Sequence, residues 1–522
     1  MRNVPDHPSD PQAIQWRHDA PASVVVFLVA LPLCLGIALA SGAPLFAGII
    51  AGVIGGLVVA PLSGSALMVS GPAAGLTAIV LAAITQLGDF RAFLLAVVIG
   101  GLIQLALAAL RAGIIGYYFP SAVIKGMLSA IGVVLILKQL PHAFGYDADA
   151  MGDETFAQAN AENTFSGIAH ALEAIEPGAA IIALISVVIL FVWPLTPLAK
   201  VRLFPAPLAV VSFGIGMNAL IGSVRPDLML TATHLVGLPL PTSAGAWGAQ
   251  FAFPAWGAIT NPVVWRIGLT LGIVASLETL LSLEATDKMD PFKREAPPNR
   301  ELFAQGIGNM LSGLVGGLPV TGVIVRSAAN VDAGARTRWS AILHGVLLVA
   351  AVLLIPRVLN LIPLAALAAI LLHTGWKLAH PTILRSMVRL GRSQWMPYVV
   401  TLVAILFTDL LVGITIGMTV GVFIILRDTL LNPPFTVVSP AGAVLTRWQL
   451  HDHLNFLNKA ALLNELESLA PGSRIEVDGR MTRRIDADAL EVLHEFNDTA
   501  VLRNIDYRLV AIPPRRVGAG AH

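Results

Sequence analysis

Long apolar runs recur along most of this 522-residue chain, and they restrict what it can fold into. The first covers residues 21–40, and others follow at short intervals up to residue 431. Hydrophobic residues make up 56% of the chain and charged residues only 12%, about half the charged fraction of a soluble protein. A soluble fold of this size could not bury so much apolar surface. The sequence predicts a multi-pass membrane protein and excludes a disordered, disulfide-stapled or nucleic-acid-binding protein.

About fourteen segments are apolar enough to cross or enter a bilayer. The first is too long for the apolar part of a signal peptide, and many more follow it, so we expect an uncleaved helix. Beyond residue 431 the charge content becomes that of a soluble protein, and strand-like and helix-like runs alternate. We therefore expect a cytoplasmic segment at 1–20, a transmembrane domain at 21–431, a small α/β domain at 435–513 and a disordered tail at 514–522.

Loop charges predict the orientation. The loop at 139–177 contains seven acidic residues and no Lys or Arg. The loops that would lie on the other side of the membrane carry Lys or Arg, at 111–112, 199–202, 288–300, 336–338 and 385–392. Positive loops face the cytoplasm, so both termini are predicted to be cytoplasmic in a plasma or inner membrane.

Two predicted spans are interrupted in the same way. One contains Ser70-Gly71-Pro72 and the other Thr321-Gly322, each a hydroxyl–glycine pair between an extended run and a helix of about half the membrane thickness. Non-helical backbone at membrane depth is tolerated only where it is buried in protein or lines a cavity. The pairs are 251 residues apart, close to half the chain.

With seven segments in each half, the second half would insert upside down relative to the first. The N-termini of the two half-helices would then face each other across the membrane midplane, and their free N–H groups would form an anion site. The alternative is that these glycines only allow close helix packing. Two matching interruptions favour the anion site.

Two ionisable residues lie inside the predicted spans. Glu278 stands well within its span, with Ser282 one turn further along the same face, and Arg326 begins the second half-helix. A buried charge in a bilayer costs on the order of 3 kcal/mol and so indicates a function. Glu278 could hold Na⁺, exchange a proton, offset the charge of Arg326 or serve as a structural carboxylate. Arg326 could add positive charge to the anion site or pair with Glu278.

Signatures of catalysis are missing from the sequence. There is no phosphate-binding Walker loop, nucleophile elbow, zinc-protease motif or dinucleotide fingerprint in a suitable context. We expect a protein that is not an enzyme and needs no cofactor beyond a Na⁺ ion at most.

The chain resembles the SulP (sulfate permease) family of anion transporters over nearly its whole length. The resemblance rests on several short motifs taken together: Leu31-Pro32, Gly36-Ile37-Ala38-Leu39-Ala40-Ser41-Gly42, Val69-Ser70-Gly71-Pro72, Asn299-Arg300-Glu301-Leu302, Gly308-Asn309, Gly317-Leu318-Pro319-Val320-Thr321-Gly322 and Arg326-Ser327.

This resemblance implies an all-α polytopic fold with about fourteen transmembrane segments. They would form two inverted repeats of seven, arranged as a core and a gate domain with two half-helices, in a homodimer. The C-terminal domain is similar to the family's STAS domain, here shortened and with Asp488 where a small hydroxyl is usual.

The resemblance also implies site residues. Those that would contact the anion are Leu33, Ile37, Ala73, Ala74, Gly322, Val323, Ile324, Val325 and Arg326. Those that would hold a coupling Na⁺ or H⁺ are Glu278, Ser282, Gly322 and Ile324. In Na⁺-coupled members an aspartate stands in place of the longer Glu278, and a threonine stands in place of Ile324. Proton coupling is therefore at least as plausible as Na⁺ coupling.

Residues 24–36 resemble the subgroup often associated with carbonic anhydrases, which favours bicarbonate as substrate, with sulfate next. We therefore expect a secondary active transporter of small inorganic anions that works by an elevator-like movement, with a functional link to a carbonic anhydrase. An uncoupled exchanger or channel and a dicarboxylate transporter are the alternatives. A membrane sensor that signals through the C-terminal domain is less well supported, because that domain contains no catalytic or partner motif.

A cysteine introduced at Ala159 in a Cys34-free background tests the orientation. Because the 139–177 loop is expected outside the cell, an impermeant maleimide added to intact cells should label this cysteine. Labelling that requires cell lysis would reverse the predicted topology.

Overall fold

The computed structural model describes residues 15–72, 74–148, 156, 162–200, 204–238, 248, 250–431, 433–438 and 445–514. Four of the sequence predictions therefore fall, wholly or in large part, outside the described residues. They concern the segment at 1–20, Ala73, the labelling position Ala159 and the tail at 514–522.

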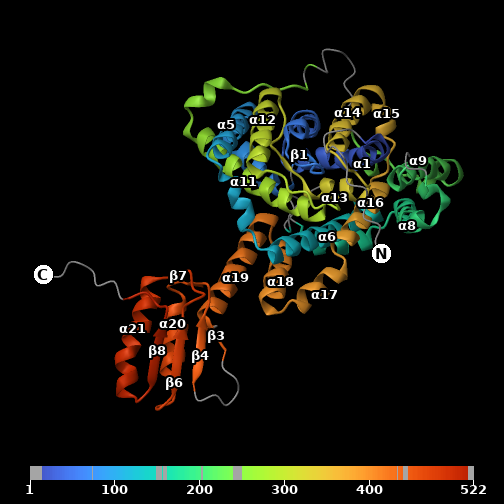
Figure 1. Cartoon of the computed structure of the whole chain (residues 1–522). Coiled ribbons are helices and arrows are strands. Elements are labelled where there is room, and N and C mark those ends of the chain that lie inside the picture. The colour runs from blue at the N-terminus through green and yellow to red at the C-terminus, as the bar shows by residue number, and fades with distance from the viewer. Residues whose placement is uncertain are drawn as a thin grey trace. The chain divides into compact units, whose positions relative to one another are not determined.

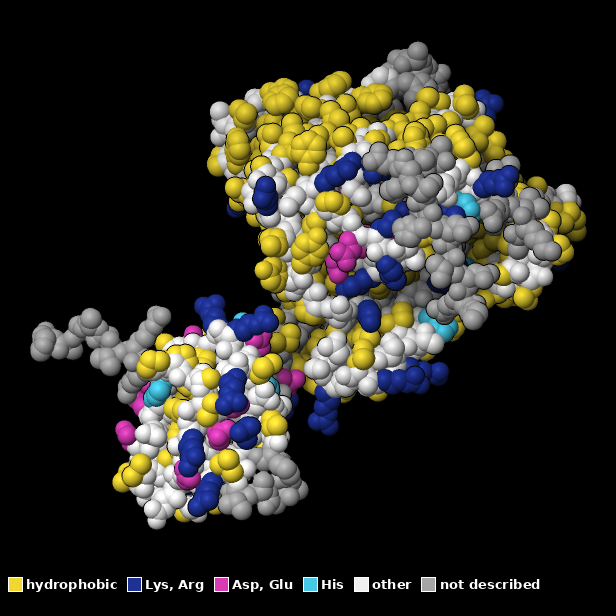
Figure 2. Space-filling view, in the orientation of Figure 1, with side chains coloured by type: hydrophobic (Ala, Val, Ile, Leu, Met, Phe, Trp, Pro, Cys, Tyr) yellow, Lys and Arg dark blue, Asp and Glu magenta, His cyan; other side chains and the backbone are white. Residues whose placement is uncertain are grey.

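The chain divides into two compact units, Met1–Met418 and Thr419–His522. The first is helical and the second contains most of the strands, as Figure 1 shows. Hydrophobic side chains cover much of the visible surface of the helical unit, whereas charged side chains are spread over the visible face of the C-terminal unit (Figure 2). Eight described helices are long and apolar enough to cross a membrane. The count of fourteen segments stays a prediction, because several other apolar helices, among them α14, α16 and α18, are shorter than this length.

The helices of the first unit pack in two groups. In one, α1 contacts α2, α13 and α14, while α5 packs against α11 and α12. In the other, α6 packs against α16 and α18, and α8, α9 and α16 contact one another. The bounds are α1 Trp16–Ala40, α2 Leu45–Ile54, α5 Phe90–Ala109, α6 Ser121–Phe144, α8 Pro177–Val192, α9 Ala206–Val224, α11 Pro262–Met289, α12 Pro298–Val315, α13 Ile324–Asp332, α14 Trp339–Leu354, α16 Leu364–Leu378 and α18 Arg392–Phe407.

The two interrupted segments meet in a two-stranded antiparallel sheet. β1 (Ser70–Pro72) pairs with β2 (Val320–Gly322), and the register places Ser70 opposite Gly322. All six residues are buried. The extended runs predicted from the sequence are therefore present, and each satisfies the backbone groups of the other, as a membrane interior requires.

Side chains of the second half-helix hold the chain that leads into β1. Ser327 Oγ accepts from Val69 N at 3.0 Å, and Asn330 Nδ2 donates to Leu67 O at 2.9 Å. Val323 N also donates to Val69 O at 2.9 Å. These bonds replace the helical partners that an extended segment lacks.

Helix α12 holds both strands from one side. Asn309 accepts from Val320 N at 2.6 Å and donates to Val320 O at 2.8 Å. One helical turn away, Gln305 Nε2 donates to Ser70 Oγ at 2.7 Å. Both amide side chains are buried, so α12 fixes the position of the strand pair.

The acid-rich segment 139–177 is predicted from the sequence to be a loop, but part of it is helical in the structure. α6 continues to Phe144, and a further helix, α7, covers Thr164–Glu173. Asn163 starts α7, because its side chain accepts from the backbone N–H groups of Phe165 and Ser166. That cap was readable in the sequence as an Asn followed by a mildly amphipathic run.

The C-terminal unit is the expected small α/β fold. Its main sheet has the order β3-β4-β6-β8, in which β4, β6 and β8 are parallel and β3 is antiparallel. A separate short pair joins β5 to β7. The bounds are β3 Phe435–Val437, β4 Thr446–Leu450, β5 His453–Leu454, α20 Asn458–Glu467, β6 Arg474–Asp478, β7 Arg484–Ile485, α21 Ala487–Leu502 and β8 Asp506–Val510. The short strands β3, β5 and β7 were not predicted.

Replacing Asn309 by Leu tests the role of α12 in holding the strands. The substitution leaves the buried N–H and C=O of Val320 without their partner, at a cost of about 1–3 kcal/mol for each group. We expect a lower unfolding temperature of the detergent-solubilised protein and loss of anion binding. Thr270→Val is the control, because Thr270 is exposed and bonds only its own helix. Equal stability of the two variants would contradict the assignment.

Candidate functional site

A half-helix follows each strand of the β1–β2 pair. After β1 the chain continues into η2 (Ala74–Leu76) and α4 (Thr77–Leu87), and after β2 it continues into α13. Because the strands are antiparallel, the two half-helices leave the pair in opposite directions with their N-terminal ends nearest the strands. Each end carries free N–H groups and a partial positive charge. This is the geometry predicted for an anion site.

Helix α1 packs against this region from one side. It contacts β1, α4 and α13, and it carries Leu33 and Ile37, two of the residues predicted to contact the anion. Both side chains are buried. Of the other predicted anion-contacting residues, Ala74, Gly322, Ile324 and Val325 are buried and Val323 is half-buried. Ala73 lies outside the described residues.

Glu278 on α11 lies against the start of the first half-helix. A methyl group added to Gly75 would lie 3.0 Å from Glu278 Oε1, so the carboxylate contacts the backbone there. The side chain of Glu278 is 5% exposed. A titratable group is therefore held directly against one half-helix N-terminus.

The same face of α11 contacts the end of β2. Gly322 N lies 3.4 Å from Thr279 Oγ1, and a methyl group added to Gly322 would lie 3.3 Å from Ser282 Cβ. Ser282 and Glu278 were predicted to share a site; Ser282 lies beside Gly322 at the end of β2, and Glu278 lies beside Gly75, shortly after β1. Thr279 was not predicted, although a hydroxyl beside Glu278 in an apolar span was a usable signal.

The side chain of Arg326 lies in different surroundings from that of Glu278. Its Nη2 donates to Cys34 Sγ at 3.3 Å, and a methyl group added to Gly71 would lie 2.1 Å from its Nη1. Within the described part of the chain, Nε and Nη1 of this fully buried residue have no hydrogen-bond partner. Of the two roles considered from the sequence, the hydrogen-bonded pair with Glu278 is not formed.

A second buried carboxylate was missed by the sequence reasoning. Glu301 on α12 accepts from Ser63 Oγ at 2.5 Å and from Gln305 Nε2 at 3.1 Å. Gln305 in turn reaches Ser70 of β1. Glu301 and Gln305 are four residues apart in an apolar stretch, and that spacing was the available signal.

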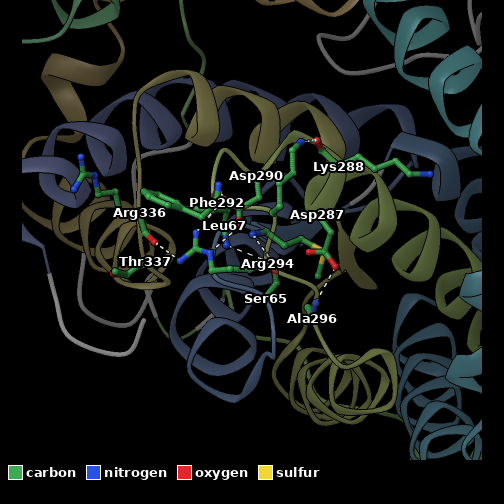
Figure 3. A network of polar contacts seen from close by, with 12 residues as sticks. Ser65, Leu67, Asp287, Lys288, Asp290, Phe292, Arg294, Ala296, Arg336 and Thr337 are labelled. Carbon is green, nitrogen blue, oxygen red and sulfur yellow. Dashed lines mark hydrogen bonds and ion pairs between the residues drawn. The ribbon is translucent and has the colours of Figure 1, made fainter. Parts of the chain in front are cut away.

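The connection between α11 and α12 is a network of paired charges rather than a simply positive loop (Figure 3). Arg294 forms an ion pair with Asp290 at 2.6 Å and donates to the carbonyl of Arg336 at 2.8 Å. Asp287 accepts from Ala296 N at 2.8 Å. A cavity of about 260 Å³ lies beside this network and is lined also by Ser65 and other residues of that region.

A larger cavity, of about 410 Å³, lies between the two helix groups. Its lining comes from α1 and α13 on one side and from α8, α9 and α16 on the other. Arg17 and Lys377 line it, and Lys377 lies 3.5 Å from Asp332 at the end of α13. This space is where the two groups would separate if they moved against each other.

The oxygen donors near the strand pair can hold a small hard cation or a proton. Glu278, Thr279 and Ser282 supply a carboxylate and two hydroxyls, and Gly322 supplies a backbone carbonyl. Val323 and Ile324 can offer only backbone atoms. Na⁺ is a hard ion that takes oxygen ligands, so the set suits Na⁺, and the lone carboxylate equally suits a proton. The described residues contain no cluster suited to a transition metal.

Several known proteins are similar to this chain. The model of the Sulfate permease family matches residues 16–404. Among curated proteins, the putative sulfate transporter YvdB of Bacillus subtilis is 27% identical over 417 residues, covering 79% of this chain and 74% of that protein. The bicarbonate transporter BicA of Picosynechococcus is 25% identical over 415 residues, covering 78% and 69%.

Solved structures show the same fold. The transmembrane domain of a cyanobacterial BicA matches 78% of this chain and 99% of that domain, with 24% identity and a TM-score of 0.54. The murine anion transporter Slc26a9, in an inward-facing state, matches 98% of this chain and 87% of that chain, with 14% identity and a TM-score of 0.65. These relatives are named as transporters and not as enzymes, in agreement with the sequence prediction. The chain belongs to the sulfate permease family of membrane anion transporters.

Proposed function

We propose that this protein is a secondary active transporter of small inorganic anions, coupled to Na⁺ or H⁺ through Glu278. The observation that carries the proposal is the contact of a buried carboxylate with the start of the first half-helix. A methyl group on Gly75 would meet that carboxylate at 3.0 Å. The anion and the coupling ion would therefore share one backbone segment.

The anion binds between the N-terminal ends of η2–α4 and α13. Free backbone N–H groups at both ends donate to the anion, and Leu33 and Ile37 of α1 close the site with apolar surface. No cationic side chain is needed in contact with the anion. Such a site discriminates by size and charge more than by detailed shape.

Coupling follows from charge. An ionised Glu278 repels an anion held at the neighbouring half-helix, and a bound proton or Na⁺ removes that repulsion. The cation and the anion therefore bind with positive cooperativity, and each raises the affinity for the other by the same factor. The protein then moves mainly with both the cation and the anion bound or with neither bound, which is what symport requires.

The names of the relatives favour bicarbonate and sulfate as substrates. YvdB and BicA are named as a sulfate and a bicarbonate transporter, and both cover most of this chain. Bicarbonate stays our first choice because of residues 24–36, with sulfate second and a dicarboxylate as the alternative. A functional link to a carbonic anhydrase would supply the bicarbonate.

The movement we propose is elevator-like. The strand pair, both half-helices, α1 and α11 form one packed group, and α6, α8, α9, α16 and α18 form the other. The cavity of about 410 Å³ lies between them. We further propose a homodimer in a plasma or inner membrane, with cytoplasmic termini and a STAS-like C-terminal unit.

Glu278→Gln tests the coupling. The amide keeps the shape of the protonated carboxyl but cannot change its charge. In proteoliposomes that contain labelled bicarbonate or sulfate, gradient-driven accumulation should fall at least tenfold, while exchange at equilibrium should persist. Full coupled accumulation by this variant would exclude Glu278 as the coupling group and favour an uncoupled exchanger.

Glu301→Gln is the matched comparison, because Glu301 is also a fully buried carboxylate but is hydrogen-bonded by two side chains. We expect lower thermal stability with gradient dependence retained. If gradient dependence is lost in Glu301→Gln and not in Glu278→Gln, the coupling group is Glu301 on α12.

A further inference from the structure

A short helix, α17 (Pro381–Arg389), joins the apolar helices α16 and α18, and Figure 1 shows it beside α18. It also contacts α6. Its nine residues are too few to cross a bilayer, which takes about 20. Because it connects two helices of the membrane domain, α17 lies at the boundary between membrane and water. The loop charges place this connection on the predicted cytoplasmic side.

One face of α17 attaches it to the helical unit. Ile383 and Met387 are one helical turn apart, and both belong to a cluster with Ala122 of α6 and Tyr398 of α18. Met387 is buried there. These contacts fix the rotation of α17 about its own axis, so the directions of its other side chains are fixed as well.

Two further faces of α17 are exposed and differ in chemistry. Leu384 and Val388 are one turn apart and are 41% and 54% exposed. Arg385 and Arg389 are also one turn apart and exposed. Because successive helical residues are turned by about 100°, the exposed apolar face lies between the buried face and the basic face. This arrangement is typical of a helix that lies in the plane of a membrane surface.

The basic face has no counterion in the described part of the chain. The guanidinium groups of Arg385 and Arg389 form no hydrogen bond or ion pair with a described residue, and neither does that of Arg392, the first residue of α18. In addition, no described side chain caps the start of α18 at Gly391. Guanidinium groups and free helix N-termini both bind phosphate groups, so this set suits a phosphate.

Two tryptophans indicate the depth of α17 in the membrane. Trp376, near the end of α16, is 46% exposed, and Trp395, in the first turn of α18, is half-buried. Tryptophan is enriched at the membrane–water interface, at the level of the lipid headgroups. Because α17 connects the two helix ends that carry these residues, its basic face lies at the level of the headgroup phosphates.

We propose that α17 is a binding surface for anionic phospholipids. Leu384 and Val388 enter the outermost part of the acyl chains, and Arg385, Arg389 and Arg392 bind the headgroup phosphate. A soluble anion would not require the exposed apolar face, and a zwitterionic lipid brings no net charge to three unpaired arginines. Because α17 packs on α6 and α18, bound lipid holds this helix group at the membrane surface. The inference does not depend on which anion is transported.

The test compares phosphatidylglycerol with phosphatidylcholine of the same acyl chains, titrated into the full-length protein in detergent and counted by native mass spectrometry. The wild type should bind phosphatidylglycerol more tightly. Combining Arg385→Gln, Arg389→Gln and Arg392→Gln should weaken phosphatidylglycerol binding by about fivefold for each arginine removed, with phosphatidylcholine binding unchanged. Equal affinities of the wild type for the two lipids would overturn the proposal.

A second set of variants separates loss of charge from misfolding. Replacing the same three arginines by Lys keeps the charge and should keep the preference for phosphatidylglycerol. A lysine variant that loses this preference as fully as the glutamine variant would overturn the charge-based assignment. Arg225→Gln is the control, because Arg225 is exposed but already paired with Asp227 at 2.9 Å, and it should bind both lipids like the wild type.

The same measurement distinguishes other occupants of α17. Excess inorganic phosphate should not displace phosphatidylglycerol, because the acyl chains contribute to binding; displacement would indicate a site for soluble anions and overturn the lipid assignment. Leu384→Ser combined with Val388→Ser should weaken the binding of both lipids. If another protein surface covers α17 instead, the glutamine variant would keep the lipid preference of the wild type, and the proposal would fail.

Discussion

Extended backbone in the middle of a membrane must find hydrogen-bond partners within the protein, and this requirement organises the helical unit. β1 and β2 supply part of the solution by pairing with each other. Asn309 and Gln305 of α12 bond to the two strands from one side, and Ser327 and Asn330 of α13 bond to the chain ahead of β1. Once the strands are fixed, the half-helix N-termini are fixed as well, and with them the proposed anion site.

Two buried charges of opposite sign lie near this strand pair, in separate surroundings. Glu278 contacts the first half-helix at Gly75, and Arg326 occupies the niche beside Gly71 and Cys34. No hydrogen bond between these two side chains is present among the described residues, although both lie close to the strand pair.

The sequence predicted those parts of the fold that have a local signal. Apolar runs predicted the membrane helices, the repeated hydroxyl–glycine pairs predicted the two interrupted spans, and alternating patterns predicted the C-terminal α/β unit. Long-range partners had no such signal. The bond from Cys34 to Arg326 joins residues 292 positions apart, and that from Gln305 to Ser70 joins residues 235 positions apart. Short strands such as β3 were missed because three residues carry too little periodicity, and α7 was missed because acidic charge suggested a loop.

The most direct test of the central claim is the position of a bound anion, measured by anomalous diffraction from crystals soaked in selenate or bromide. The account predicts a peak between the start of η2 at Ala74 and the start of α13 at Ile324, near Leu33 and Ile37. A peak confined to the cavity lined by Arg17 and Lys377 would contradict it.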